Sequence, residues 1–481
     1  MLQRPGGRRR QHGRVRRSLL LALSLTALAV PAQTRAAQAR DPLAAVPAVR
    51  VVRPGFALPA TPAYLNVNIT VRYARTARPR AVLLLMPGLL GGAGSFDRLA
   101  RQLVTRDPTL AVWAVDRRAY ALEPQSQIAR ADPATLARIA REGLPATPAA
   151  QLKFMQDWGL DTTLRDWRVA VQEAKKLTPN VFIGGHSLGG VLTGLYAAYD
   201  FDGTPGFADV KGLVMLDGVL GSTAARPLTE VEYQTGFTEL GLFSPGLTGL
   251  VAKPYLQTDF FGPVTAARAA AQARLAARTP LGLSPSGLAP VPATNLAAAL
   301  LQLERRYSIL SFLAVTTGRA TNTTEGPNLA AFALNPTFNP NSARVTGLID
   351  PKKPAGWQQD PGAPTDAQDL VNRFWLPTGD FSEWYFPARL TLDISAAGTG
   401  TLGTPFSALR VYHDPEVNLP VLGLAAQNGL TSEDQYRAYA RRTRAQLSVQ
   451  TLPGYAHLDV VTARSDTVAA RIDDWLKGIA R

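Results

Sequence analysis

Cysteine is absent from all 481 positions of the sequence. Its absence excludes disulfide bonds, thiolate metal sites, cysteine nucleophiles and covalent lipoprotein anchors. Histidine is scarce as well, because only His12, His186, His413 and His457 occur. No two of them stand at the spacing of a metal site, and any reaction that depends on a histidine base has few positions open to it.

Long hydrophobic runs are also lacking. The apolar run over residues 18–30 is shorter than the about 20 residues that a membrane-spanning helix requires, and no other run is long and apolar enough. We therefore expect no stable membrane span.

Residues 1–39 are predicted to be a signal peptide. Nine arginines and no acidic residue occur in residues 1–40, and small residues follow the short apolar run. Cleavage after Ala39, or after Ala32, would release a protein that is secreted or held in the periplasm or cell envelope. The pair Arg16 and Arg17 leaves both the general and the twin-arginine export routes open.

Concentrated positive charge is missing from the rest of the chain. The formal net charge is +15, but +9 of it belongs to residues 1–40 and the remaining +6 is spread out. No basic stripe is interleaved with aromatic residues, which argues against nucleic-acid binding. The sequence has no P-loop and no Gly-x-Gly-x-x-Gly turn after its first strand. We expect no cofactor and no metal, and the sequence identifies no partner protein.

What the chain does contain is an alternation of apolar runs and helical segments. Continuous apolar runs are typical of strands that helices cover on both faces. This order predicts an α/β fold with a doubly wound, mostly parallel sheet. A strict alternation over residues 65–73 predicts one further strand, half-buried and antiparallel, near a sheet edge. The continuous runs are Ala81–Met86, Leu110–Val115, Val181–Ile183, Leu213–Leu216, Leu419–Ala426 and Leu447–Leu452.

The alternation stops between residues 221 and 414. We interpret this stretch as a large cap or lid insertion that divides the core into residues 40–220 and 415–481. Helices are expected over residues 265–278 and 295–317, and a polar run rich in proline and asparagine follows over residues 319–369. The aromatic residues between 374 and 386 are expected to pack inside the fold rather than to form a lipid-contact patch.

One turn carries a recognisable chemical motif. Residues 181–190 read as a buried strand, then Gly-x-Ser-x-Gly centred on Ser187, then a helix. Such a turn holds the serine in strained backbone geometry at the top of a sheet, and side chains at Gly185 and Gly189 would collide with their neighbours. Ser187 is therefore the candidate nucleophile.

A serine nucleophile needs a base, which is usually a histidine. His12 leaves with the signal peptide, and His186 is fixed within the turn. His413 precedes the penultimate strand, where a surface role is expected. His457 lies between the last strand and the last helix, where the chain order serine, acid, histidine places the base. His457 is therefore the candidate base.

These motifs make the chain similar to the α/β-hydrolase superfamily, in particular to lipases and esterases, over residues 60–220 and 415–481. Residues 185–190, Gly-His-Ser-Leu-Gly-Gly, are the most specific element. Residues 86–92 resemble the oxyanion loop of the family, with Pro87 where histidine usually stands. Asp116-Arg117-Arg118 resembles the Asp-Arg-x-Gly turn of the family without its glycine. The resemblance implies that the backbone amides of Leu89 and Leu188 form the oxyanion hole.

The acid of the catalytic triad has two candidate positions. The family usually carries it after the penultimate strand, but no carboxylate follows that strand until Glu433 and Asp434. Some members carry it after the preceding strand, where Asp217 directly follows four apolar residues. We assign Asp217 as the acid and keep Glu433 or Asp434 as the alternative.

The sequence therefore predicts an exported serine hydrolase that cleaves small-molecule or lipid carboxylic esters through an acyl-enzyme. Two alternatives share the scaffold. One is a peptidase or amidase, and the other is a catalytically silent binding protein with the hydrolase fold.

Overall fold

The central sheet has eight strands. The computed structural model describes residues 42–221, 228–239, 242–258, 261–329, 339, 341–397 and 407–480, so the predicted signal peptide lies outside the described residues. Across the sheet the strands follow the order β1 (Ala48–Pro54), β2 (Val67–Tyr73), β4 (Leu110–Asp116), β3 (Ala81–Met86), β5 (Val181–His186), β6 (Leu213–Leu216), β15 (Pro420–Asn428) and β16 (Gln446–Ala456).

The sheet is mostly parallel. β3 pairs in parallel with β4 and β5, and the parallel pairing continues through β6 and β15 to β16. β2 is antiparallel to both of its neighbours, β1 and β4, and lies next to the edge as expected, but most of its residues are buried, so the expectation of a half-buried strand is wrong. The predicted fold class is confirmed.

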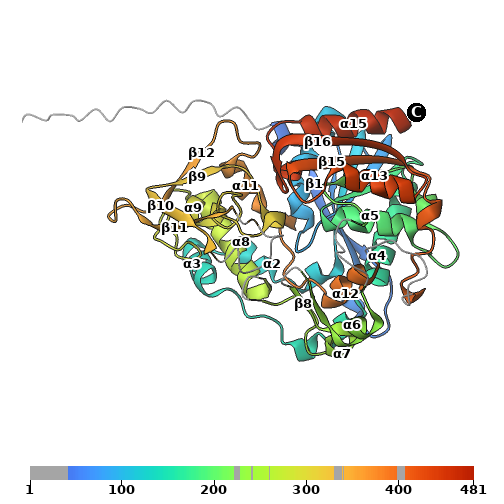
Figure 1. Ribbon diagram of the computed structural model, residues 1–481, viewed down its shortest axis with the longest axis horizontal. Helices are drawn as coiled ribbons and strands as arrows, with labels where there is room; N and C mark the ends of the chain where they lie inside the picture. Colours follow the sequence, from blue (N-terminus) through green and yellow to red (C-terminus); the bar gives the residue numbers. More distant parts are fainter. Residues whose placement is uncertain are drawn as a thin grey trace, which may run out of the picture. The chain divides into compact units, whose positions relative to one another are not determined.

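Helices cover both faces of the sheet, as Figure 1 shows. Successive residues of β3 alternate between two hydrophobic clusters: Leu83 belongs to one and Leu84 to the other. This burial on both faces explains why the central strands read as continuous apolar runs. α1 (Asp97–Arg106) and α15 (Thr467–Ile479) contribute to the first cluster; α4 (Leu160–Lys175), α5 (Leu188–Ala198) and α13 (Glu433–Arg442) contribute to the second.

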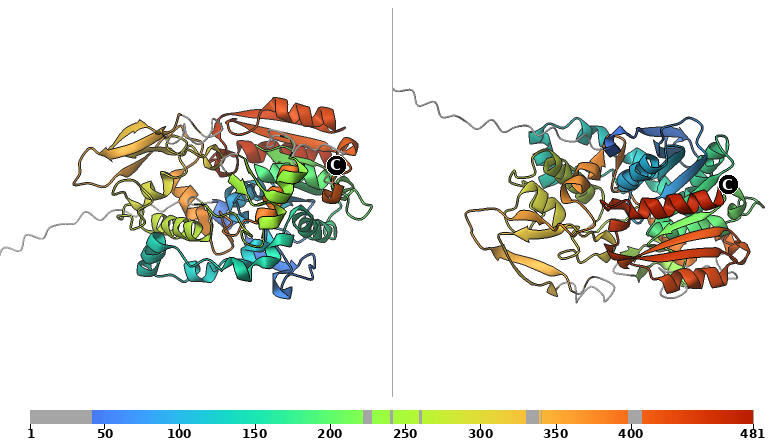
Figure 2. Two further views of the ribbon diagram at one scale, coloured as in Figure 1. Left: turned by 60° about the horizontal axis from the view of Figure 1, so that its bottom comes forward. Right: turned by 90° about the horizontal axis from the view of Figure 1, so that it is seen from above.

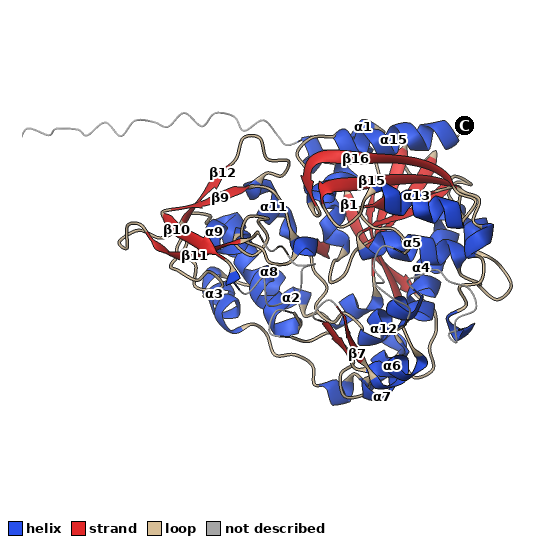
Figure 3. Ribbon diagram, in the orientation of Figure 1, coloured by secondary structure: helices blue, strands red, loops and turns tan. Residues whose placement is uncertain are grey.

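The chain between β6 and β15 forms short elements beside the sheet rather than part of it (Figure 3). Two-stranded sheets, β9 with β12 and β10 with β11, form in the polar run, where the sequence showed no alternation of strands and helices. The elements are α6 (Glu230–Thr235), β7 (Phe237–Glu239), β8 (Leu242–Ser244), α7 (Gly246–Gly249), α8 (Pro263–Arg278), α9 (Asn295–Leu300), β9 (Gly318–Thr321), β10 (Thr323–Pro327), β11 (Ala343–Leu348), β12 (Gly356–Gln359), α11 (Ala367–Phe374), β13 (Trp375–Leu376), β14 (Gly379–Asp380) and α12 (Ala388–Ala397).

The helix expected over residues 295–317 is wrong in its length, because α9 ends at Leu300. The buried carboxylate of Glu304 accepts hydrogen bonds from the Thr317 amide and hydroxyl and from the Gly318 amide. These bonds fold the chain back on itself, so the apolar residues after Leu300 pack against each other instead of extending the helix.

A second segment supports the insertion, and the sequence did not predict it. Between β4 and α4 the chain forms α2 (Gln125–Ala129) and α3 (Pro133–Glu142), and α3 packs on α8. Both views in Figure 2 show α8 lying beside these helices. Trp384 and Tyr385 belong to the same hydrophobic cluster and are buried, which confirms that the aromatic residues pack inside the fold. Among the described residues, no helix is long and apolar enough to cross a membrane.

Candidate active site

The site is built around the turn that joins β5 to α5. Ser187 occupies this turn with φ 58° and ψ −125°, a backbone conformation that non-glycine residues rarely adopt. Its amide donates to the Leu216 carbonyl of neighbouring β6 at 2.8 Å, which holds the turn against the sheet. Ser187 thus stands at the carboxyl end of a central strand and at the N-terminus of a helix.

The glycines around Ser187 allow backbone segments to touch. A Cβ atom on Gly185 would lie 2.3 Å from the backbone of Gly189, and one on Gly189 would lie 1.9 Å from the Met86 carbonyl oxygen. A Cβ atom on Gly190 would collide in the same way, because it would lie 2.1 Å from the Gly218 oxygen. The motif is therefore required sterically by the packing of β3, β5 and β6.

His457 lies between the end of β16 and α14 (Asp459–Thr462), and its side chain is buried. Its Nδ1 is 2.5 Å from Oδ2 of Asp217. The other ring nitrogen, Nε2, is buried and has no hydrogen-bond partner among the described residues. The ring is therefore oriented by a carboxylate on one side and has an unused nitrogen on the other.

Asp217 follows β6 directly and is completely buried. Besides His457, its carboxylate accepts hydrogen bonds from the amides of Ala426 and Leu430 and from the Thr431 hydroxyl, at 3.1, 2.9 and 2.7 Å. Burial raises the pKa of Asp217, but the hydrogen bonds from His457, Leu430 and Thr431 outweigh it and hold the pKa below its usual value. The carboxylate is thus ionised at neutral pH.

The alternative acids lie elsewhere. Glu433 and Asp434 are in the first turn of α13. Glu433 accepts hydrogen bonds from the Thr451 amide and hydroxyl and pairs with Arg437. Asp434 pairs with the same arginine at 3.1 Å. Both carboxylates have partners other than His457, whereas the loop between β15 and α13 supplies amides to Asp217.

His186 lies beside the candidate base. Its Nε2 is 2.9 Å from the carbonyl oxygen of His457, and the two ring centroids are 4.3 Å apart. Burial, together with the neighbouring His457, lowers the pKa of His186 to about 3, so its ring is neutral. The sequence excluded His186 as a base but did not predict that it supports the histidine loop. His413 lies apart from this group, bonded to Asp200 and Glu416.

The loop of residues 87–92 lies against the nucleophile turn. A Cβ atom on Gly88 would lie 2.9 Å from the Cβ of Ser187. The amides of Leu89 and Leu188 donate to no other group among the described residues. Both are the amides that the family resemblance assigns to the oxyanion hole.

The insertion touches the site at two places. Its residues 380–386 run antiparallel to the 87–92 loop, where the Gly92 amide donates to the Phe381 carbonyl and the Glu383 amide donates to the Leu90 carbonyl, at 2.9 and 2.8 Å. Near His457, buried Asp459 accepts hydrogen bonds from the Thr316 amide and the Thr365 hydroxyl.

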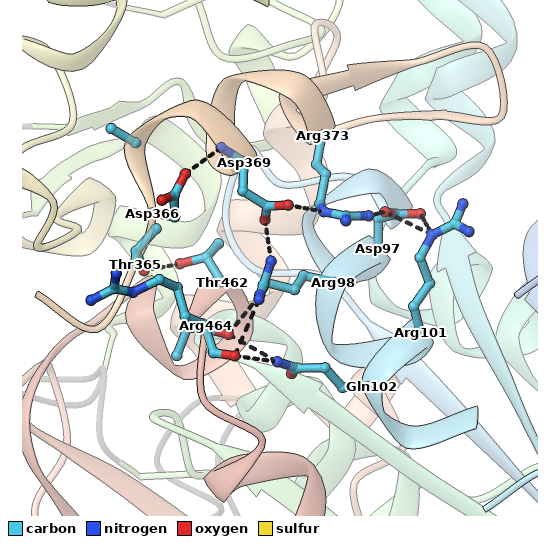
Figure 4. Close-up of polar contacts among 12 residues, drawn as sticks. Asp97, Arg98, Arg101, Gln102, Thr365, Asp366, Asp369, Arg373, Thr462 and Arg464 are labelled. Carbon is cyan, nitrogen blue, oxygen red and sulfur yellow. Dashed lines mark hydrogen bonds and ion pairs between the residues drawn. The ribbon is translucent and has the colours of Figure 1, made fainter. Parts of the chain in front are cut away.

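A polar network extends this second contact (Figure 4). Arg373 of α11 pairs with Asp97 at the start of α1, at 2.6 Å. Arg98 of α1 pairs with Asp369 of α11 and donates to the carbonyl of Ala463, which follows α14. The network joins the insertion, the first core helix and the segment after His457, so the insertion is tied to both halves of the core.

Arg117 is the residue near the site whose role sequence reasoning missed. It follows β4, its side chain is 2% exposed, and it donates to three carbonyls of the 87–92 loop. The signal was present in the Asp-Arg motif at residues 116–117.

Among the described residues, no group of three histidine or acidic side chains could hold a metal ion.

Comparisons with known proteins give structural matches only. No family model matches the chain, and no curated protein matches it. The matched structures include a protein assigned as a lipase from Sulfolobus solfataricus, at 14% identity over 89% of this chain and 93% of the other, with a TM-score of 0.49. An epoxide hydrolase from an endophytic Streptomyces matches at 15% identity over 90% and 96%, with a TM-score of 0.42. A thermophilic esterase from Thermogutta terrifontis matches at 12% identity over 90% and 99%, with a TM-score of 0.36.

The fold is identified by the chain's own architecture. A single sheet carries the serine turn after β5, Asp217 after β6 and His457 after β16, in the order serine, acid, histidine. Together with the parallel strands and the antiparallel β2, this arrangement shows that the chain has the α/β-hydrolase fold.

Proposed function

We propose that the protein is a serine hydrolase that cleaves carboxylic esters through an acyl-enzyme. The observation that carries the proposal is the 2.5 Å contact between His457 Nδ1 and Asp217, with the remaining ring nitrogen buried and unused. A histidine held in this way is prepared to accept a proton from a serine hydroxyl. Ser187 stands on the turn after β5, with the strained backbone of a nucleophile turn.

The reaction proceeds in two halves. The Ser187 oxygen bonds to the ester carbonyl carbon while His457 takes the hydroxyl proton, and the amides of Leu89 and Leu188 hold the resulting oxyanion. His457 then gives the proton to the departing alcohol, which leaves an acyl-serine. Water, deprotonated by His457, attacks the acyl-serine, and His457 returns the proton to the departing Ser187 oxygen, which releases the carboxylic acid and restores the free serine. Asp217 orients the imidazole throughout and stays ionised.

Apolar side chains around the site favour an ester with an apolar acyl group. Leu89 and Leu188 are half-buried and pack on the same hydrophobic cluster as the half-buried Leu310, Phe312 and Leu313 of the insertion. The insertion therefore adds apolar side chains to the cluster on which Leu89 and Leu188 pack. This environment supports small-molecule or lipid esters as the substrate class.

The proposal extends to the location of the protein. The arginine-rich residues 1–39 support export, with the mature enzyme acting outside the cytoplasm. N-terminal sequencing of the protein recovered from its native compartment would find a start at residue 40, or at residue 33. An N-terminus at Met1 would contradict export by cleavage.

The direct test is labelling with a fluorophosphonate, which bonds covalently to activated serines. We expect the wild-type protein to gain one label on Ser187 and to hydrolyse p-nitrophenyl esters. Ser187→Ala should lose both, with hydrolysis reduced on the order of 10⁴-fold or more, because triad residues act as a unit.

His413→Ala is the matched control, since His413 lies apart from Ser187 and should leave most of the rate. An active Ser187→Ala protein would contradict the mechanism. A folded wild-type protein that neither labels nor turns over would favour a silent binding protein.

A further inference from the structure

The guanidinium of Arg117 donates hydrogen bonds to the loop of residues 87–92. Nη1 donates to the Pro87 carbonyl at 3.1 Å, and Nη2 donates to the carbonyls of Gly88 and Gly91 at 2.9 and 2.8 Å. The donors are buried, so these bonds are shielded from water and are stronger than exposed ones. Three carbonyls within five residues are thus held at one charged group.

The bond to Gly88 has a consequence for the next residue. The Gly88 carbonyl and the Leu89 N–H belong to the same planar trans peptide, so they point in opposite directions. Holding the carbonyl at Arg117 therefore fixes the Leu89 N–H on the side away from Arg117. Gly88 itself lies against Ser187, since a Cβ placed on it would be 3.3 Å from the Ser187 hydroxyl oxygen.

The charge also acts on the peptide. A cation at the carbonyl end of an amide draws electron density toward the oxygen and makes the N–H at the other end a better donor. The Leu89 amide, which would donate to the developing oxyanion, is therefore both oriented and polarised by Arg117 at the carbonyl end of the same peptide.

The insertion supplies the group that holds Arg117. Nε of Arg117 donates to Oε2 of Glu383 at 2.7 Å, and the glutamate is buried. The Glu383 amide donates to Leu90, so the residue that neutralises Arg117 also pairs with the loop that Arg117 holds. The centroid of the Phe386 ring lies 4.9 Å from the guanidinium carbon, so the ring packs on one face of the cation.

We propose that Arg117 is a positioning residue that orients and polarises the Leu89 amide for the oxyanion, and that Glu383 of the insertion holds Arg117 in place. This inference rests on the proposed function and assigns the insertion a part in the chemical step. A lysine cannot replace Arg117, because a single ammonium does not reach three carbonyls and a carboxylate in one plane.

The test compares Arg117→Lys with Arg118→Lys in the full chain. Arg118 is the matched control: it is buried, pairs with Asp166 at 2.7 Å, and forms no hydrogen bond with the 87–92 loop within the described part of the chain. We expect Arg117→Lys to lower kcat about 10²- to 10³-fold, the effect of losing one oxyanion donor, with KM within about threefold. Arg118→Lys should keep kcat within about threefold even where its melting temperature falls.

A second readout separates positioning from a merely structural role. A boronic acid forms a tetrahedral adduct with an activated serine, so its affinity depends on the oxyanion hole. Across the variants, the inhibition constant of the boronic acid should rise in proportion to the loss of kcat/KM. A change in KM or in melting temperature with kcat and boronate affinity unchanged would overturn the proposal.

Glu383→Gln keeps an oxygen for the Arg117 Nε and removes only the charge. We expect kcat to fall about tenfold at unchanged KM, since a hydrogen bond to a neutral acceptor is weaker. If Arg117→Lys fails to fold, this variant decides the matter, and an unchanged kcat overturns the proposal. Fluorophosphonate labelling of the wild type separates the proposed function from the positioning role of Arg117. An unlabelled wild type refutes the proposed function. A labelled wild type with an unaffected Arg117→Lys variant refutes only the positioning role.

Discussion

The two sides of the candidate site are held in place by different kinds of force. The Ser187 side depends on glycines within a few residues of the serine, where backbone touches backbone. The Leu89 side depends on Arg117 and on Glu383, which stands 266 residues further along the chain. The first side is sterically and locally determined, and the second is electrostatic and assembled from distant segments. Their difference predicts that each will fail in its own way.

The largest expected effect concerns the acid, Asp217. Asp217→Asn should lower turnover about 10⁴-fold while the protein still folds, because the amide no longer holds the imidazole in the required tautomer. Glu433→Gln should stay within about tenfold of wild type. Steady-state hydrolysis of a short p-nitrophenyl ester, with circular dichroism as the folding check, measures both. An active Asp217→Asn protein and a dead Glu433→Gln protein would move the acid to the loop after β15.

A smaller effect tests whether close packing, rather than charge, sets the position of the acid. Gly429 lies against Asp217, and a Cβ atom there would be 2.0 Å from the carboxylate oxygen. We expect Gly429→Ala to lower kcat about 10²-fold by displacing the carboxylate, in line with the effect of a misplacement of about 1 Å.

Gly478 in α15 is the matched control for this variant, because a Cβ atom there meets nothing within 4 Å. Gly478→Ala should leave kcat unchanged and, as an alanine in a helix, raise the melting temperature slightly. Equal kcat values for the two variants would show that Asp217 tolerates displacement.

The smallest expected effect concerns buried charge on the Leu89 side. Buried Glu123 accepts a hydrogen bond from the Trp384 amide of the insertion, at 3.0 Å. Burial, and then the charge of Asp380, raises the pKa of Glu123 well above its usual value. Folding therefore takes up a proton, and the free energy of unfolding falls as the pH rises above about 4.3, the value in the unfolded chain.

Glu123→Gln removes this titration and keeps the acceptor for Trp384, while the Gln125 amide can turn to donate or accept as needed. We expect its melting temperature to exceed that of wild type by a few degrees at pH 8 and to match it near pH 4, since about 1 kcal/mol shifts a melting temperature by a few degrees. Calorimetry at the two pH values measures the difference. A variant that is less stable than wild type at pH 8 would show that the ionised carboxylate stabilises the insertion.

The sequence predicted the Ser187 side of the site better than the Leu89 side. The Ser187 turn and the strand that precedes Asp217 were predictable, because the apolar runs and the glycines that mark them stand together in the sequence, even where the glycines contact distant strands. The role of Arg117 and the support from Glu383 were not, because an ion pair across 266 residues leaves no spacing to detect. The helices α2 and α3 were missed for a related reason: their apolar faces pack on α8, a partner far along the chain. The length of α9 depended on Glu304, which accepts hydrogen bonds from residues 317 and 318, further along the chain.

Gly429 also bears on how such an enzyme could change over evolutionary time. The loop after β15, where the family usually carries the acid, converges with Asp217 on one small volume beside His457. A lineage that gained a carboxylate in that loop before losing Asp217 would place two like charges where one fits. A lineage that lost Asp217 first would pass through an inactive ancestor. The two arrangements are therefore separated by a barrier to stepwise substitution, although their acids would occupy almost the same point in space.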